Sequence, residues 1–148
     1  MNAAEQATSV EFASKIATAV RIFKAHFPDL RADLQPWTTD QDTQAWVDPD
    51  SIDLGFHFPG VSRLFKCRSL LVQIRFYQDP VEASHQVIGI DVAGFGHQGK
   101  QWALSTVERW EFVGDNCPEA ATGQQLKQCC QQIFDLFKSG ESRNVQGP

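Results

Sequence analysis

The sequence predicts an α+β fold: a four-stranded antiparallel β-meander, with an N-terminal and a C-terminal helix packed on one face of the sheet (α-β4-α). Four stretches alternate apolar and polar residues with the period of two that is typical of strands with one buried side. Two further stretches, before and after the strands, repeat apolar residues at helical spacing. The 148 residues, 42% of them hydrophobic, suffice for one core, so residues 1–138 are expected to form a single domain.

The first helix is predicted over residues 9–26. Thr8 and Glu11 have the spacing of a capping box, in which side chains satisfy the free N–H groups at the start of a helix. The apolar residues that follow at steps of three and four are Phe12, Ile16, Val20, Phe23 and Phe27. Pro28 is expected to end the helix, because the residue before a proline is disfavoured in the helical conformation.

The second helix is predicted over residues 122–138. Thr122 and Gln125 repeat the capping-box spacing. The apolar stripe that follows consists of Leu126, Cys130, Ile133 and Phe137. The last segment, 139–148, lacks apolar anchors and is therefore predicted to be a disordered tail.

The four predicted strands lie between these helices. They cover residues 52–58, 69–77, 86–93 and 101–113, and the second is taken as central. The inward residues of that strand are Leu70, Val72, Ile74 and Phe76. Short antiparallel connections would place Phe58 opposite Leu70, Phe76 opposite Ile88, and Val92 opposite Trp102. This register makes one face almost wholly apolar, so we expect both helices to cover that face.

The opposite face of the predicted sheet is polar and is the first candidate binding surface. The same register puts Asp53 across from Arg75. It also puts Gln73 across from Asp91, which Arg75 reaches diagonally. The residues expected around this group are His57, Tyr77, Ser105 and Arg109. Two interpretations stay open: a solvated face with weak cross-strand ion pairs, and a groove for a partner or ligand.

The polar connection between the first helix and the first strand contains two tryptophans, Trp37 and Trp46. Bulky aromatic residues in a long loop either lie against the domain or are presented to a partner. Trp37 and Trp46 are therefore a second candidate binding surface.

The glycine-rich segment Gly94–Lys100, GFGHQGK, is the third candidate. Gly94, Gly96, Gly99 and Lys100 together satisfy two phosphate-binding patterns, GxxxxGK and GxGxxG. However, Gln101 replaces the Ser or Thr that would hold magnesium, and the next segment alternates like a strand rather than a helix. We expect a hairpin loop, with an anion-binding nest as the alternative.

No pattern in the sequence indicates a metal, a cofactor or a catalytic centre. The four cysteines lack CxxC and Cys/His spacing and are expected to be free thiols. His57 could act as a general base beside Asp53, but the sequence offers no second convergent set of catalytic groups.

Composition narrows the function classes. The net charge of −5 disfavours nucleic acids and anionic membranes as partners, although Arg63, Lys66 and Arg68 form a local basic cluster. No signal peptide or membrane-spanning apolar run is present, so we expect a soluble, cytoplasmic protein.

These features favour a non-enzymatic protein-binding module, such as an adaptor, chaperone or assembly factor. It would bind another protein through the polar sheet face or a strand edge, and a strand edge could also pair two copies of the chain. The alternative is a small-molecule-binding or catalytic domain that uses the same face and the Gly94–Lys100 loop.

Overall fold

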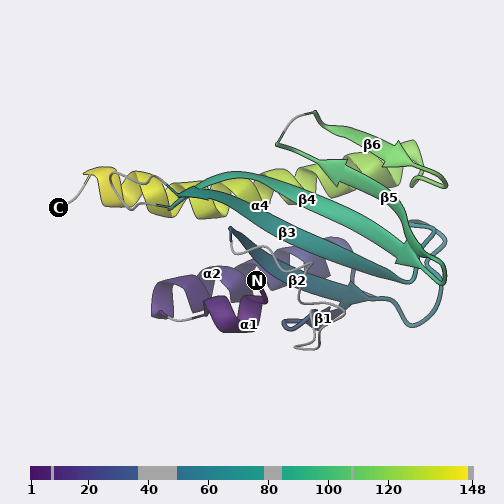
Figure 1. Ribbon diagram of the computed structural model, residues 1–148, viewed down its shortest axis with the longest axis horizontal. Helices are drawn as coiled ribbons and strands as arrows, with labels where there is room; N and C mark the ends of the chain where they lie inside the picture. The colour runs from purple at the N-terminus through teal and green to yellow at the C-terminus, as the bar shows by residue number, and fades with distance from the viewer. Residues whose placement is uncertain (8, 37–49, 79–84, 108, 147–148) are drawn as a thin grey trace.

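The computed structural model describes residues 1–7, 9–36, 50–78, 85–107 and 109–146. The predicted fold class is confirmed: the protein is α+β, with an antiparallel sheet and helices in the N- and C-terminal parts of the chain (Figure 1). The predicted number of strands is wrong, because the sheet has six strands, in the order β1-β2-β3-β4-β5-β6. Neighbours in the sheet thus follow the order of the chain, as expected of a meander.

The elements have the following bounds. The strands are β1 Arg31–Asp33, β2 Ser51–His57, β3 Ser69–Gln78, β4 His85–Gly96, β5 Gly99–Ser105 and β6 Glu111–Gly114. The helices are α1 Ala3–Gln6, α2 Val10–His26 and α4 Ala120–Gln146.

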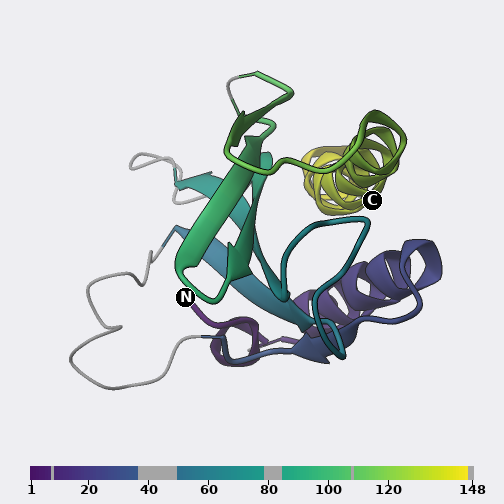
Figure 2. The ribbon, with the colours of Figure 1, turned by 90° about the vertical axis from the view of Figure 1, so that its right-hand side faces the viewer.

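Both long helices, α2 and α4, lie on the same side of the sheet (Figure 2). The ring of Phe23 in α2 stacks on Phe56 in β2, with 4.5 Å between centroids. Phe137 of α4 meets Phe76 of β3 edge to face at 5.9 Å. The helices also touch each other, since Lys15 Nζ donates to the Phe137 carbonyl at 3.5 Å. The core therefore lies between this helical layer and one face of the sheet.

The starts of the two helices differ from the sequence prediction. The N-cap of α2 is Ser9, whose Oγ accepts from the Phe12 N–H at 3.1 Å, and Thr8 lies outside the described residues. Helix α4 begins at Ala120, so Thr122 and Gln125 lie within its first turns and the predicted capping box is wrong. Gln125 is instead used to contact α2, as described below.

The C-terminal helix α4 extends to Gln146, whereas the sequence placed its end near Lys138. The division of the chain into a domain of residues 1–138 and a disordered tail of residues 139–148 stays a prediction.

Two strands have no counterpart of their own in the prediction. Strand β1 is only three residues long, too short to show alternation, and is recognised by its pairing with β2. The single strand expected over 101–113 is two strands, β5 and β6, that pair antiparallel with Ala103 opposite Val113. Phe112 lies opposite Leu104, so the apolar residues near the end of the predicted strand belong to a chain that has turned back rather than continued straight.

The register between β2 and β3 and between β4 and β5 differs from the prediction, but the core-facing side of these strands does not. Phe56, rather than Phe58, pairs with Leu70, so Asp53 lies opposite Gln73 and not Arg75. Between β4 and β5, Trp102 pairs with Gly94 and not with Val92. Each shift is by an even number of residues, which leaves the same side chains facing the core because strand side chains alternate with a period of two.

A β-bulge between Arg75 and Phe76 overturns one predicted pair. Arg75 pairs with Gly89, but the next residue, Phe76, pairs with Val87, which leaves Ile88 as the extra residue. As a result Val87 is 7% exposed and Ile88 is 44% exposed. The prediction that Ile88 faces the core opposite Phe76 is therefore wrong.

Candidate functional site

A row of polar residues crosses the sheet face opposite the long helices. Asp53, Gln73, Asp91 and Ser105 occupy directly paired positions on four successive strands. Asp53, however, is 0% exposed. Its carboxylate accepts from Ser51 Oγ at 2.6 Å and Gln73 Nε2 at 3.2 Å, and it pairs with the Met1 ammonium at 3.0 Å. Asp53 is thus held inside the protein, below the N-terminal segment, and is not accessible to a partner.

Asp91 of this row is partly accessible, and Arg75 of β3 lies beside it. Arg75 Nε lies 3.8 Å from Asp91 Oδ2, so the predicted diagonal pair is present, and each side chain is about one third exposed. Asp91 Oδ1 is buried and has no hydrogen-bond partner among the residues that the structure describes. The predicted cross-strand position of Asp53 opposite Arg75 is wrong, because Asp53 lies opposite Gln73 and Arg75 lies opposite Ser51.

The remaining candidates for the polar face are dispersed. Tyr77 is 53% exposed at the far end of β3. Arg109 is exposed but belongs to the connection between β5 and β6 rather than to a strand. Trp37 and Trp46 lie outside the described residues, so their role stays a prediction.

His57 pairs with Asp33 of β1 and not with Asp53. The distance from His57 Nε2 to Asp33 Oδ2 is 3.3 Å, and both side chains are partly exposed. Ser69 lies directly across from His57 on β3, and these three residues line a hollow of about 190 Å³. Sequence analysis missed this group because β1, which carries Asp33, was not predicted.

The glycine-rich segment forms the β4–β5 hairpin, with Gly96 paired to Gly99. Gly99 has a φ of +107°, a conformation that favours glycine. At Gly94 the reason is space, because a Cβ there would lie 2.4 Å from Trp102 Cε2. The predicted hairpin is confirmed, and turn geometry and packing explain these two glycines. Anion binding by Gly94, Gly96, Gly99 and Lys100 stays a prediction.

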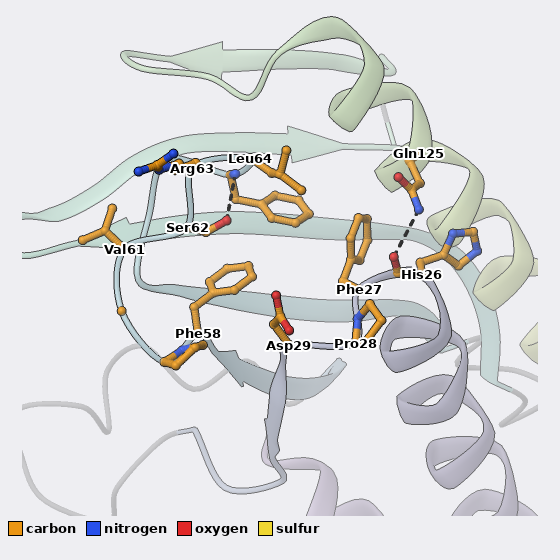
Figure 3. Close-up of a pocket in the computed structure, with 13 residues that line it drawn as sticks. His26, Phe27, Pro28, Asp29, Phe58, Val61, Ser62, Arg63, Leu64 and Gln125 are labelled. Carbon is orange, nitrogen blue, oxygen red and sulfur yellow. Dashed lines mark hydrogen bonds between the residues drawn. The ribbon is translucent and has the colours of Figure 1, made fainter.

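An apolar pocket of about 360 Å³ lies where the end of α2, the β2–β3 connection and the start of α4 meet (Figure 3). Three phenylalanine rings line it: Phe27, Phe58 and Phe65. The Phe65 ring is central, 4.7 Å from Phe27 in an edge-to-face arrangement and 5.4 Å from Phe58. The rings therefore line one continuous aromatic surface.

Local hydrogen bonds fix the backbone at Phe27 and Phe65. Phe27 is the C-cap of α2, and its N–H donates to the Phe23 carbonyl at 2.8 Å. Phe65 N–H donates to Ser62 Oγ at 3.1 Å, and the Phe65 carbonyl accepts from Trp102 Nε1 at 2.9 Å. On the α4 side, Gln125 Nε2 donates to the His26 carbonyl at 3.1 Å. The pocket walls are therefore fixed by the fold.

Charged and aliphatic residues surround the mouth of the pocket. Asp29 and Arg63 are both exposed lining residues, and Figure 3 shows the Asp29 carboxylate between Phe58 and Phe27, with Arg63 on the other side. Val61 is 63% exposed and Leu64 is 56% exposed. The site thus combines an aromatic interior, one acidic group, one basic group and two exposed aliphatic side chains.

Sequence analysis did not identify this pocket, although the sequence carries a signal for it. Two Phe-Pro dipeptides, Phe27-Pro28 and Phe58-Pro59, each follow the end of a helix or strand. A proline that ends an element fixes the backbone next to the phenylalanine. Two such pairs at the same end of the sheet would have indicated a common aromatic site.

The four cysteines are free thiols, as predicted. Burial raises the pKa of Cys67 from 9.0 to about 11 and that of Cys129 to about 12. Burial also raises the pKa of Cys130, and the neighbouring Cys129 adds to this rise. Within the part of the chain that the structure describes, no group of three His, Cys, Asp or Glu residues is placed to hold a metal ion.

A family model described as a domain of unknown function matches residues 4–139. No curated protein sequence and no solved structure matches the chain. The family match spans the whole sheet and every residue of the aromatic pocket. No helix of the described ranges is long and apolar enough to cross a membrane.

Proposed function

We propose that this chain, which belongs to a family described as a domain of unknown function, is a protein-binding module. The aromatic pocket is its binding surface. The observation that carries this proposal is the pocket itself: a concave, preformed site lined by three phenylalanines, with Val61 and Leu64 exposed beside it. Buried aromatic anchors and concave apolar surfaces are where binding energy concentrates in protein interfaces.

The polar sheet face supports binding less well than the pocket does. Asp53, one of the two acidic residues expected on either side of Arg75, is fully buried. The accessible Arg75–Asp91 pair is partly solvated at 3.8 Å, and exposed ion pairs of this kind contribute about 0–1 kcal/mol. The pocket offers apolar area that a partner side chain can remove from water, at about 25 cal/mol per Å².

The proposal is tested by affinity capture from a native lysate with immobilised wild type, Leu64→Asp and Val10→Asp. Leu64 borders the pocket, whereas Val10 is 88% exposed at the other end of α2, ~24 Å along the helix from His26. Both variants add one carboxylate at an exposed aliphatic position and should fold normally, which a thermal melt checks.

The expected result is that proteins captured by the wild type are retained by Val10→Asp and lost by Leu64→Asp. The same captured set with all three proteins would show that the pocket is not the binding surface.

A second candidate function, small-molecule binding or catalysis on the polar face, is supported by the contact of His57 Nε2 with Asp33 Oδ2 at 3.3 Å, beside Ser69. A histidine oriented by a carboxylate and next to a hydroxyl is a common acid–base arrangement. The test is a panel of metabolites screened by thermal shift against wild type and His57→Ala. A compound that stabilises only the wild type would support this function, and no stabilising compound would count against it.

A further inference from the structure

Building on the proposed function, we infer that the aromatic pocket accepts a basic side chain, Lys or Arg, from the partner protein. Three features of the site support this specificity: the aromatic lining, the position of the Asp29 carboxylate, and the size of the cavity.

The aromatic lining suits a cation that carries an apolar stem. A ring face attracts an ammonium or guanidinium group within about 6 Å of its centroid, and the attraction strengthens when the cation is shielded from water. Phe27 stands at 77° to Phe65, with Phe58 beside them, so the wall of the pocket presents rings in different orientations. The methylene stem of Lys or Arg gains apolar contact on the same rings.

The carboxylate of Asp29 supplies the opposite charge. It lies between Phe58 and Phe27 in Figure 3, at the mouth of the pocket. Among the described residues it makes no ion pair and no hydrogen bond, and Arg63, on the other side, does not neutralise it. A charge-assisted hydrogen bond to Asp29 would hold the head group of a bound Lys or Arg. An uncharged side chain cannot form this charge-assisted hydrogen bond.

Cavity size and overall charge agree with this occupant. A volume of about 360 Å³ lies at the small end of the ~300–1,000 Å³ range of ligand pockets, which fits one side chain better than a large cofactor. The chain as a whole carries a net charge of −5, which favours the approach of a basic partner. The β2–β3 connection at the pocket, however, carries Arg63, Lys66 and Arg68, so Asp29 must supply the local negative charge.

The experiment is an NMR titration of ¹⁵N-labelled protein with four probes. Three are Nα-acetyl amino-acid amides of lysine, norleucine and glutamate, and the fourth is tetramethylammonium chloride. Norleucine keeps the aliphatic stem of lysine without the charge, so the difference between these two probes isolates the cation. The readout is the saturable shift of the Leu64 and Phe65 backbone amides.

The lysine amide should bind with a Kd on the order of millimolar, roughly tenfold tighter than the norleucine amide. The glutamate amide should not shift the pocket signals. Asp29→Asn should remove the preference for lysine over norleucine. The matched control Asp135→Asn, on α4 and ~15 Å along the helix from Gln125, should keep it. Phe58→Leu, which preserves apolar volume but removes a ring face, should weaken the lysine amide more than the norleucine amide.

Three outcomes would overturn the inference. Equal binding of lysine and norleucine amides would show an apolar pocket without charge selection. Preferred binding of the glutamate amide, lost in Arg63→Gln, would show an anion site. Tighter binding of tetramethylammonium than of the lysine amide would show a site for a free organic cation. If any of these outcomes is found while Leu64→Asp still loses the captured proteins, only the preference for a basic side chain is refuted. The proposed protein-binding function then remains supported.

Discussion

Replacement of Gly94 by alanine tests how tightly the sheet, Trp102 and the pocket are coupled. An ideal Cβ at Gly94 would lie 2.4 Å from Cε2 and 2.5 Å from Nε1 of Trp102, far below normal contact distance. Trp102 is 1% exposed, and because protein interiors are close-packed, moving its ring disturbs the neighbouring core side chains. Its indole Nε1 donates to the carbonyl of Phe65, the central ring of the pocket. Any displacement of Trp102 is therefore transmitted to the pocket.

The expected loss of stability follows from two contributions. Forcing an extra methyl group into a packed core costs about 1–3 kcal/mol, and weakening the buried Trp102–Phe65 hydrogen bond costs about 0.5–1.5 kcal/mol more. Gly94→Ala should therefore lower the free energy of unfolding by about 1.5–4.5 kcal/mol, a large share of the ~5–15 kcal/mol typical of a domain.

Gly96→Ala is the matched control, since Gly96 lies on the same strand and in the same glycine-rich segment. Its Cβ would meet Nε2 of Gln101, the far end of a flexible side chain that can rotate away. That variant should lose less than about 1 kcal/mol. The measurement is urea denaturation of both variants and the wild type. Equal losses in the two variants, or a loss below about 1 kcal/mol for Gly94→Ala, would refute the argument from packing.

Three further predictions concern the core, the thiols and the hairpin. Ile74, which is 0% exposed in the central strand, should not tolerate a charge, so Ile74→Asp should give no cooperative thermal transition; a folded, cooperative variant would contradict the core assignment. The pKa of Cys67 is raised from 9.0 to about 11, so the folded state keeps a thiol proton that the unfolded state loses above pH ~9. The protonated Cys67 thiol therefore makes its full contribution to the free energy of unfolding below pH ~9, and this contribution declines as the pH rises toward 11. Urea denaturation between pH 8 and 10.5 should show that the free energy of unfolding falls less steeply with pH for Cys67→Ala than for the wild type. Parallel plots of this free energy against pH would argue against the linkage. Lys100 is exposed in the β4–β5 hairpin, so Lys100→Ala should melt with the wild type, and ATP with magnesium should not raise either melting temperature; nucleotide stabilisation that is lost in the variant would restore the phosphate-loop hypothesis.

The central strand could be predicted from the sequence because its alternation has no competing pattern. Leu70, Val72 and Ile74 face the core as expected, and even-numbered register shifts leave their direction unchanged. At Val87 and Ile88 the sequence is ambiguous, because both positions are apolar and either can face inward. A bulge selects Val87, and bulges depend on how the strands twist against the rest of the fold. Such a choice is not encoded in the local pattern.

The candidate site was predicted less well, because its parts are distant in the sequence. Asp53 was expected at the surface since it lies on the polar side of its strand, but the N-terminal segment covers it and Met1 pairs with it. Met1 and Asp53 are 52 residues apart in the sequence, so no local pattern of apolar and polar residues can predict their contact. The pocket is likewise assembled from residues at the ends of elements. The apolar patterns assigned Phe27 and Phe58 to the core of the first helix and the first strand, but α2 ends at His26 and β2 at His57, and both rings line the pocket instead.

The contact between the two long helices has a consequence for how the protein is made. Lys15 of α2 and Phe137 of α4 are separated by 122 residues, which a ribosome adds in roughly 6–24 s at ~5–20 residues per second. During that interval α2 can cover only its own part of the sheet, through pairs such as Phe23 and Phe56. The rest of the apolar face stays uncovered until α4 packs on it. The nascent chain therefore has no complete core until its C-terminal helix has been synthesised.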